Sequence, residues 1–237
     1  MSDIPCFFIF YHFFPPKFAY IRKKLYLCTR KGIFAILHNM EPLKEKLNIV
    51  SLLNKPNLHE TLKELAETIM NDYCIDNGQY QYRPIEIEFY IYDHVKHPDK
   101  HVYPRDNKSA GELFFHYSGM DICFDSSLAD GFFGGILIRA LERANDNISF
   151  GGPLVCLNEV LNTAQAKCEL KQLSRPKSDR VHAVPFGKRV GINGEDKYSQ
   201  APYRFIKEGL TEIKMTRLTY NFDKSESKIY SNTYKLQ

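Results

Sequence analysis

Two glutamates lie two positions apart in a stretch where apolar residues occupy every second position, and a tyrosine follows two positions later. Glu86, Glu88 and Tyr90 alternate with apolar residues between Ile85 and Tyr92. Residues two apart in a strand point to the same face, so these three side chains share one face. A carboxylate flanked by aromatic rings can have a raised pKa and act as general base on water. On an ordinary exposed strand, the same pattern is only the solvated face.

A loop rich in histidine, aspartate, proline and lysine follows, from Asp93 to about Gly111. Pro98 prevents the helix that would align His97 with His101, which argues against a metal site here. The side chains that could suggest one are Asp93, His94, His97, Asp99 and His101. Aromatic rings stack on nucleobases and cationic loops hold phosphates. Taken alone, this pattern is weak support for nucleic-acid chemistry.

The elements that position these residues can be predicted from periodicity and turn signals. Asn57 followed by Glu60 is a capping-box signature, and apolar residues then recur at helical spacing. The recurring residues are Leu62, Leu65, Ala66, Ile69 and Met70. We also expect helices at about Pro42–Leu53 and Leu154–Gln172, and strands at Ile85–Tyr92, Leu113–Tyr117, Met120–Asp125 and Gly135–Ala140.

Several segments, in the same order along the chain, resemble the alkyladenine (3-methyladenine) DNA glycosylases. They are EIEFY (Glu86–Tyr90), His101 with PRDN (Pro104–Asn107), AGELFFHYSGMDICFD (Ala110–Asp125), GGILIRALE (Gly134–Glu142), GGPLVCLNEVLN (Gly151–Asn162), and KRVGIN with APYRFIK (Lys188–Asn193, Ala201–Lys207). The family has E-T-E-A-Y, a histidine before T-P-R-N, P-G-x-L-Y-V-Y-x-x-Y-G-M-x-x-C-x-N, V-L-I-R-A-L-E, G-P-G-x-L-x-x-A-L-x-I, and R-V-G-I with P-L-R-F-Y-V. The resemblance covers roughly residues 58–207 and none of residues 1–39.

The resemblance implies a role for each matching position. Glu88 matches the general base that activates water, and it should lie over a wet, aromatic-walled space that admits a flipped purine. Tyr90 matches an aromatic that sandwiches the flipped base. His101 matches the pocket histidine, with His97 as a possible substitute. Arg139 lies within the otherwise apolar stretch ILIRAL, where a charge needs a partner, so a structural salt bridge is as good an interpretation of it as contact with the DNA backbone. It also matches the family's arginine, and this match favours a substrate-binding role.

The chain departs from the family pattern between Gly111 and Gly119, where it is one residue shorter. Ser118 stands where the family places the tyrosine wedge that fills the gap left by the flipped nucleotide. Serine cannot stack, so Tyr117 is the other wedge candidate. Phe115 or His116 would then form the pocket floor.

A second departure from the family pattern concerns which damaged bases the protein would accept. Asp125 stands where the family has a pocket asparagine. A carboxylate there would favour cationic bases such as 3-methyladenine or 7-methylguanine and disfavour neutral hypoxanthine.

The resemblance implies a single α+β domain with a curved, mostly antiparallel sheet and peripheral helices. The expected function is hydrolytic removal of alkylated purines from double-stranded DNA by a monofunctional, monomeric glycosylase without a cofactor. One alternative is a nucleic-acid-binding member of the family whose site has lost activity. Another is the same chemistry on free nucleosides or RNA.

Composition sets limits on the class of protein. The chain has 237 residues, 43% hydrophobic and 25% charged, which is typical of a globular protein. No run of about 18 apolar residues exists, so no membrane-spanning helix and no membrane partner is expected. Six cysteines without a C-x-x-C pair favour reduced thiols in a cytoplasmic protein.

The two ends of the chain differ from the rest. Residues 1–39 contain ten of the 32 phenylalanines and tyrosines and carry a net charge of 6 − 1 = +5. We interpret them as sequence upstream of a true start at Met40, or alternatively as a basic aromatic arm that touches membrane or nucleic acid. Residues 40–217 form the expected domain, within which residues 171–217 carry a net charge of 11 − 5 = +6. Residues 218–237 are expected to be a frayed polar tail.

Overall fold

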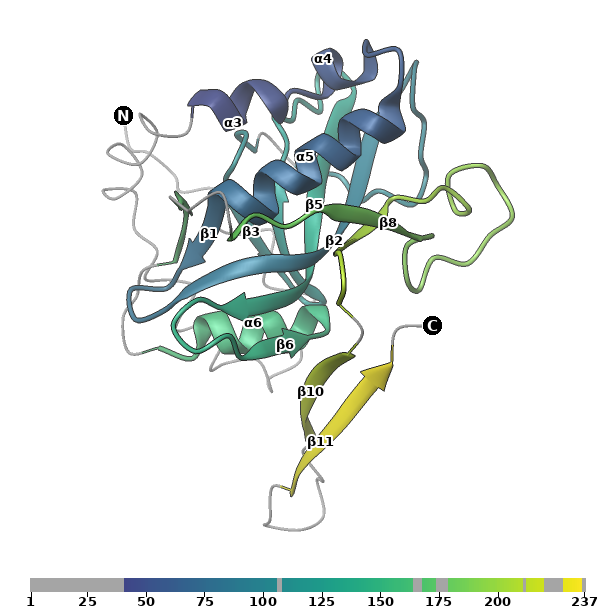
Figure 1. Ribbon diagram of the computed structural model, residues 1–237. Coiled ribbons are helices and arrows are strands. Elements are labelled where there is room, and N and C mark those ends of the chain that lie inside the picture. Colours follow the sequence, from purple (N-terminus) through teal and green to yellow (C-terminus); the bar gives the residue numbers. More distant parts are fainter. Residues whose placement is uncertain are drawn as a thin grey trace, which may run out of the picture.

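A curled antiparallel β-sheet with a few helices packed against it forms a single α+β domain (Figure 1). The computed structural model describes residues 41–105, 108–163, 168–173, 179–210, 212–219 and 228–235. The interpretation of residues 1–39, including a start at Met40, lies outside the described residues. The expected fold class is confirmed at this level.

Nine strands make up the main sheet of the described residues, and every pairing between them is antiparallel. The strands are β1 (Tyr73–Asp76), β2 (Gln81–Asp93), β3 (Leu113–His116), β4 (Gly119–Cys123), β5 (Phe132–Arg143), β6 (Ser149–Gly151), β7 (Glu169–Gln172), β8 (Ala183–Gly187) and β9 (Arg204–Lys207). Their order is β3-β4-β5-β2-β1-β7, with β6 paired to β5, and β8 paired to β9, which in turn pairs with β2. The four predicted strands correspond to β2, β3, β4 and β5.

The helices are α3 (Glu41–Lys46), α4 (Ile49–Leu53), α5 (Leu58–Asp72) and α6 (Pro153–Leu161). The single helix expected at Pro42–Leu53 is in fact two, because Asn48 has an extended backbone and caps α4 through its side chain. The predicted cap of α5 is confirmed, since the Asn57 side chain accepts a hydrogen bond from the Glu60 backbone N–H at 3.2 Å.

Helix α5 covers one face of the central strands. Its predicted apolar residues are all buried, and they share one core with the inward residues of β2, which are Ile87, Phe89 and Ile91. The opposite face of β2 carries Glu88 and Tyr90. The helix thus fixes which face of β2 remains for the polar side chains.

Helix α6 ends at Leu161, and the last part of the helix expected at Leu154–Gln172 is a strand instead. Residues Glu169–Gln172 form β7, which pairs along the outer edge of β1. That edge offers unpaired backbone groups to any extended segment, and the pairing outweighs the weak helical pattern.

The last twenty residues also contain regular structure. Strand β11 (Lys228–Lys235) pairs with β10 (Glu212–Thr219) in a separate two-stranded sheet, so the expected frayed tail holds a strand. Among the helices described, none is long and apolar enough to cross a membrane.

Candidate active site

The register of the three central strands sets the positions of the polar side chains. Glu88 on β2 pairs with Leu137 on β5, which pairs in turn with Asp121 on β4. The next row contains Tyr90, Gly135 and Cys123. Directly paired residues point to the same face, so both rows lie on the face opposite α5.

Glu88 is fully buried, at 0% exposure, and both of its carboxylate oxygens accept hydrogen bonds. Oε1 accepts from the backbone N–H of Val190 at 2.7 Å, and Oε2 accepts from the Tyr90 hydroxyl at 3.0 Å. Arg139 Nε lies 3.3 Å from Oε1. The expectation that Glu88 faces a wet space is wrong for this conformation, because the backbone at Val190 closes over it.

Burial raises the pKa of Glu88 above its ordinary value, and the opposing effects of Arg139, the Val190 N–H and the Tyr90 hydroxyl do not cancel it. Burial, together with the charge of Glu88, also raises the pKa of the Tyr90 hydroxyl. The tyrosine therefore stays protonated and donates its hydrogen bond to the carboxylate. A carboxylate of raised pKa is a stronger base once it has lost its proton.

Two arginines and Glu86 surround the general-base candidate. Glu86 Oε1 accepts from Arg139 Nε at 3.0 Å and from Arg204 Nε at 2.7 Å. Arg139 therefore bridges Glu86 and Glu88, so the salt bridge that its apolar surroundings suggested is present, while its expected role in substrate binding stays a prediction. Glu86, to which the sequence assigned no role, holds both arginines in place.

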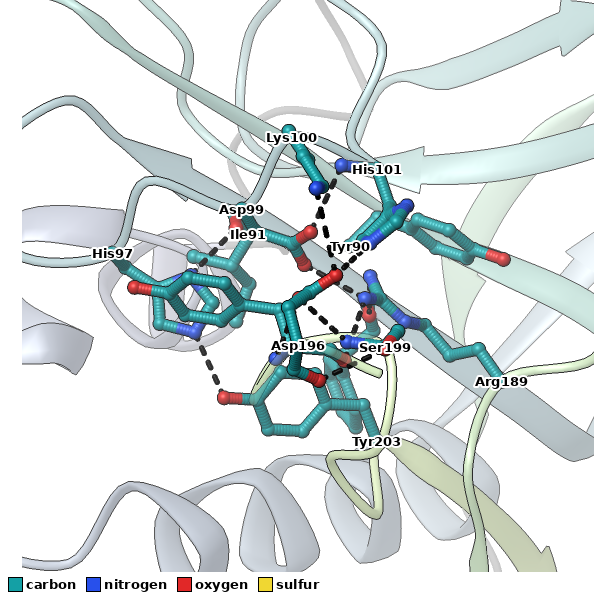
Figure 2. Close-up of polar contacts among 12 residues, drawn as sticks. Tyr90, Ile91, His97, Asp99, Lys100, His101, Arg189, Asp196, Ser199 and Tyr203 are labelled. Atoms are coloured by element: carbon teal, nitrogen blue, oxygen red, sulfur yellow. Dashed lines mark hydrogen bonds and ion pairs between the residues drawn. The ribbon is translucent and has the colours of Figure 1, made fainter. Parts of the chain in front are cut away.

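The segment of residues 188–203, between β8 and β9, is fastened to β2 by Arg189 (Figure 2). Its guanidinium donates to Asp99 at 2.8 Å and to the carbonyls of Phe89 and Tyr198 at 3.3 and 3.1 Å. It also lies 4.6 Å from the centre of the Tyr90 ring. One ring face of Tyr90 is therefore already occupied by a cation.

His101 is joined to the same network. Its Nε2 hydrogen-bonds Asp196 at 2.8 Å, and its backbone N–H donates to Asp99, which in turn binds Arg189 (Figure 2). The structure thus connects His101 to Tyr90 through two residues. The hydrogen bond from His101 lowers the pKa of Asp196.

His97, the possible substitute, has a structural role. Its two ring nitrogens hydrogen-bond the Ile91 carbonyl and the Tyr203 hydroxyl, both at 2.8 Å. Within the described residues, no group of three or more histidine, cysteine or acidic side chains is arranged to hold a metal ion.

The β3–β4 hairpin separates the candidates that the sequence placed there. Phe115 pairs with Met120 and packs against the apolar core, so it lies on the face opposite Glu88. His116 points to the other face, where it contacts Asp121. Tyr117 and Ser118 form the two-residue tip, and Tyr117 is 64% exposed.

A second polar group lies on the Glu88 face, around Asp121. This buried carboxylate is hydrogen-bonded by the Arg105 guanidinium and lies 3.3 Å from His116 Nε2. Arg105 passes over Gly135, where an added Cβ would come within 2.7 Å of its Nε. The glycine is therefore what allows Arg105 to reach Asp121.

Asp125 lies beyond the end of β4 and is exposed. Its described hydrogen bond is from its backbone N–H to the Leu47 carbonyl, at the junction of α3 and α4. No described contact joins Asp125 to Glu88.

No protein-family model and no curated protein matches this chain. The residues themselves therefore carry the functional argument.

Five cations among the described residues of the basic segment 171–217 are paired with acids elsewhere in the fold: Lys171 with Asp76, Arg180 with Asp72, Arg189 with Asp99, Arg204 with Glu86, and Lys207 with Glu142. The positive charge of these five side chains balances buried and half-buried carboxylates.

Sequence reasoning gave no role to Arg105, Asp121, Arg189 or Arg204. Two of them carry the signal that singled out Arg139, a charged residue inside an apolar stretch. Asp121 lies within GMDIC and Arg204 within YRFI, whereas Arg189 directly follows Lys188 and has no such signal. A charge in such a position requires a partner of opposite sign, so these residues could have been assigned to buried pairs.

Proposed function

We propose that this chain is a member of the alkyladenine DNA glycosylase family and hydrolyses the N-glycosidic bond of alkylated purines in double-stranded DNA. The observation that carries the proposal is the buried Glu88 carboxylate, which is linked to Tyr90 and Arg139. Glu88 and Tyr90 match one motif of the family and Arg139 matches another, and in the fold both Tyr90 and Arg139 contact the Glu88 carboxylate.

In the proposed reaction, Glu88 removes a proton from a water molecule while the water oxygen bonds to C1′ of the deoxyribose. The C1′–N9 bond breaks, and its electrons neutralise a cationic purine as the base leaves. The carboxylate also stabilises the positive charge that develops on the sugar. No lysine forms a Schiff base, so the product is an intact strand with an abasic site.

Base flipping is required because C1′ is inaccessible within a stacked duplex. Tyr117 is the wedge candidate for base flipping, since it places an exposed aromatic ring at the tip of the β3–β4 hairpin. An aromatic ring in that position can stack in the gap that a flipped nucleotide leaves. Ser118 beside it cannot.

One observation favours the alternative of a nucleic-acid-binding protein without glycosylase activity. Glu88 has no exposed surface, and the Val190 N–H occupies the oxygen that would otherwise accept from water. Hydrolysis therefore requires the 188–203 segment to move, whereas binding to DNA does not.

The experiment is excision of 7-methylguanine from alkylated duplex DNA by the wild-type protein and by Glu88→Gln. We expect the single-turnover rate of the glutamine variant to be at least about 100-fold lower, because the substitution removes the general base, the carboxylate, but keeps the volume of the side chain. Glu64→Gln, on the exposed face of α5, is the matched control and should keep full activity.

Unfolding temperatures of both variants establish that each is folded. Binding of duplex DNA without release of a base by the wild-type protein would leave the binding alternative in place and reject the enzyme.

A further inference from the structure

A cavity of about 480 Å³ lies where β2 begins and where β5 and β9 end. Its walls come from Arg83 on β2, Glu142 on β5, the turn after β5, residues 179–181, and Lys207 on β9. Arg83 precedes Glu88 by five positions along β2, which is about 16 Å in a strand. The cavity is therefore separate from the candidate active site, and its volume is in the range of pockets that hold small molecules.

Two cations share one carboxylate in this cavity. Arg83 Nη2 donates a hydrogen bond to Glu142 Oε1, and Lys207 Nζ donates to Oε2 at 2.9 Å. Burial would raise the pKa of Glu142, but the hydrogen bond from Lys207 and the charge of Arg83 outweigh it, and the pKa is lowered. The carboxylate is therefore ionised at neutral pH. The three side chains together carry one positive charge in excess.

Arg83 is the less well satisfied of the two cations. Its side chain is only 5% exposed, yet its Nε is buried without a hydrogen-bond partner among the described residues. Keeping a cation out of water is costly unless a counterion and acceptors compensate it, and here the counterion is shared with Lys207. An anion in the cavity would supply the missing negative charge.

The wall formed by residues 179–181 is held in place by the end of α5. Arg180 donates to Asp72 at 2.7 and 3.3 Å, and the backbone of Val181 exchanges two hydrogen bonds of 2.8 Å with the side chain of Asn71. These contacts fix the backbone beside the cavity without using Arg83 or Lys207. The pocket is thus formed before any ligand enters it.

The exposed rim of the cavity carries an amide and an acid. Asn147, in the turn after β5, has a φ of 57°, a left-handed conformation in which asparagine is common, and its amide can donate to a ligand. Asp179 is also exposed, so water and salt screen its charge more than that of the buried Arg83. The rim therefore does not cancel the excess charge inside.

The donors in this cavity match a phosphate group. Arginine and lysine side chains only donate hydrogen bonds, and phosphate oxygens accept several at once. We infer that the cavity binds the phosphate group of a small phosphorylated molecule about the size of a nucleoside monophosphate. The phosphate oxygens accept from Arg83 and Lys207, and the organic part lies toward Asn147 and residues 179–181. The inference does not depend on the proposed function, because no described contact joins either cation to Glu88.

The test is isothermal titration calorimetry of the full chain with inorganic phosphate and with deoxyadenosine 5′-monophosphate. We expect Arg83→Met to weaken binding of both compounds at least about tenfold, because it removes a charged donor and the excess charge. The variant should fold, since Glu142 keeps Lys207 as its counterion. Lys207→Met, which leaves Arg83 paired with Glu142, is a second variant with the same expected loss.

Lys55→Met is the matched control, because it removes an exposed charge from the turn after α4 and should change both dissociation constants by less than about twofold. Equal weakening by Arg83→Met and Lys55→Met would overturn the inference, since it would indicate general attraction of anions. Failure of the wild-type protein to bind either compound at about 10 mM would also overturn it.

Two further measurements separate the small molecule from DNA. If Arg83→Met weakens binding of undamaged duplex DNA, and neither small compound binds the wild-type protein, the cavity holds a phosphate of the DNA backbone and the inference is wrong. Lost phosphate binding with an unchanged rate of 7-methylguanine excision in Arg83→Met would support a site that is independent of Glu88.

Discussion

Arg189 and Asp99 form an ion pair with no exposed surface, the deepest pair in the described part of the chain. Taking two charges out of water is costly, and the pair is tolerated because the two terminal nitrogens of the guanidinium donate further hydrogen bonds, although its buried Nε has no partner among the described residues. These bonds also hold the backbone of the next residue, Val190, against Glu88. A buried ion pair thus positions the general-base candidate.

We predict that Asp99→Asn lowers the free energy of unfolding by about 3–5 kcal/mol, because it leaves the Arg189 charge buried without a counterion. Urea denaturation measures the change. Combining it with Arg189→Met should cost less than the sum of the two single changes, since the double variant has no uncompensated charge. A loss below about 1 kcal/mol for Asp99→Asn would contradict this account of the pair.

The residues that meet at Glu88 could be predicted only in part. Alternation placed Glu88 and Tyr90 on one face, and the resemblance added Arg139. Their burial could not be predicted, because the cover comes from Val190, about a hundred positions further along the chain. Alternation gives the face of a strand but not what packs on it.

At the scale of elements, α5 is the support on which β2 rests. Its apolar side packs on Ile87, Phe89 and Ile91, and its first turn is capped by Asn57. The cap satisfies a backbone N–H that has no partner within the helix. The orientation of β2, and so of Glu88, depends on this packing.

We predict that Asn57→Ala lowers the free energy of unfolding by about 1 kcal/mol through loss of the cap. Asn57→Asp is the matched control and should retain nearly all of the stability, because aspartate also accepts from the Glu60 N–H. Urea titration of the three proteins side by side measures both effects. An alanine variant as stable as the aspartate variant would show that the cap contributes nothing.

Elements with strong local signals were found from the sequence, and elements defined by distant partners were not. The cap and spacing of α5 and the alternation of β2 are local. Strand β7 exists because β1 offers it an edge, and β9 because β2 does. Neither short segment has a periodicity that would indicate a strand by itself.

At the scale of the whole molecule, residues 40–237 carry 26 basic and 27 acidic side chains, so they are close to neutral. Many of these charges are paired within the fold. The pKa values of Asp76, Asp93, Asp121 and Glu142 are all lowered, because hydrogen bonds and nearby cations outweigh the effect of burial. Glu88 is the exception, with a raised pKa.

These directions predict how stability depends on pH. A carboxyl whose pKa is lowered by folding stabilises the protein above its ordinary pKa, and that contribution is lost as pH falls. We therefore expect the free energy of unfolding to decrease below about pH 4. Glu88 acts in the opposite sense, since its raised pKa favours the protonated form and costs stability as pH rises above the ordinary carboxyl range.

Urea denaturation between pH 3 and pH 8 tests both effects. Glu88→Gln should give a flatter curve than the wild-type protein on the alkaline side of the ordinary carboxyl pKa, because it removes a group whose raised pKa costs stability there. Identical curves would contradict the raised pKa of Glu88.

The hydrogen bond from the Val190 N–H to Glu88 has a consequence for ligand affinity. A purine or a water molecule can reach the carboxylate only in those molecules in which this backbone has moved aside. The apparent dissociation constant then equals the intrinsic one divided by the fraction of open molecules. Substitutions that loosen residues 188–203 would therefore tighten binding at Glu88 without altering a single atom that the ligand touches.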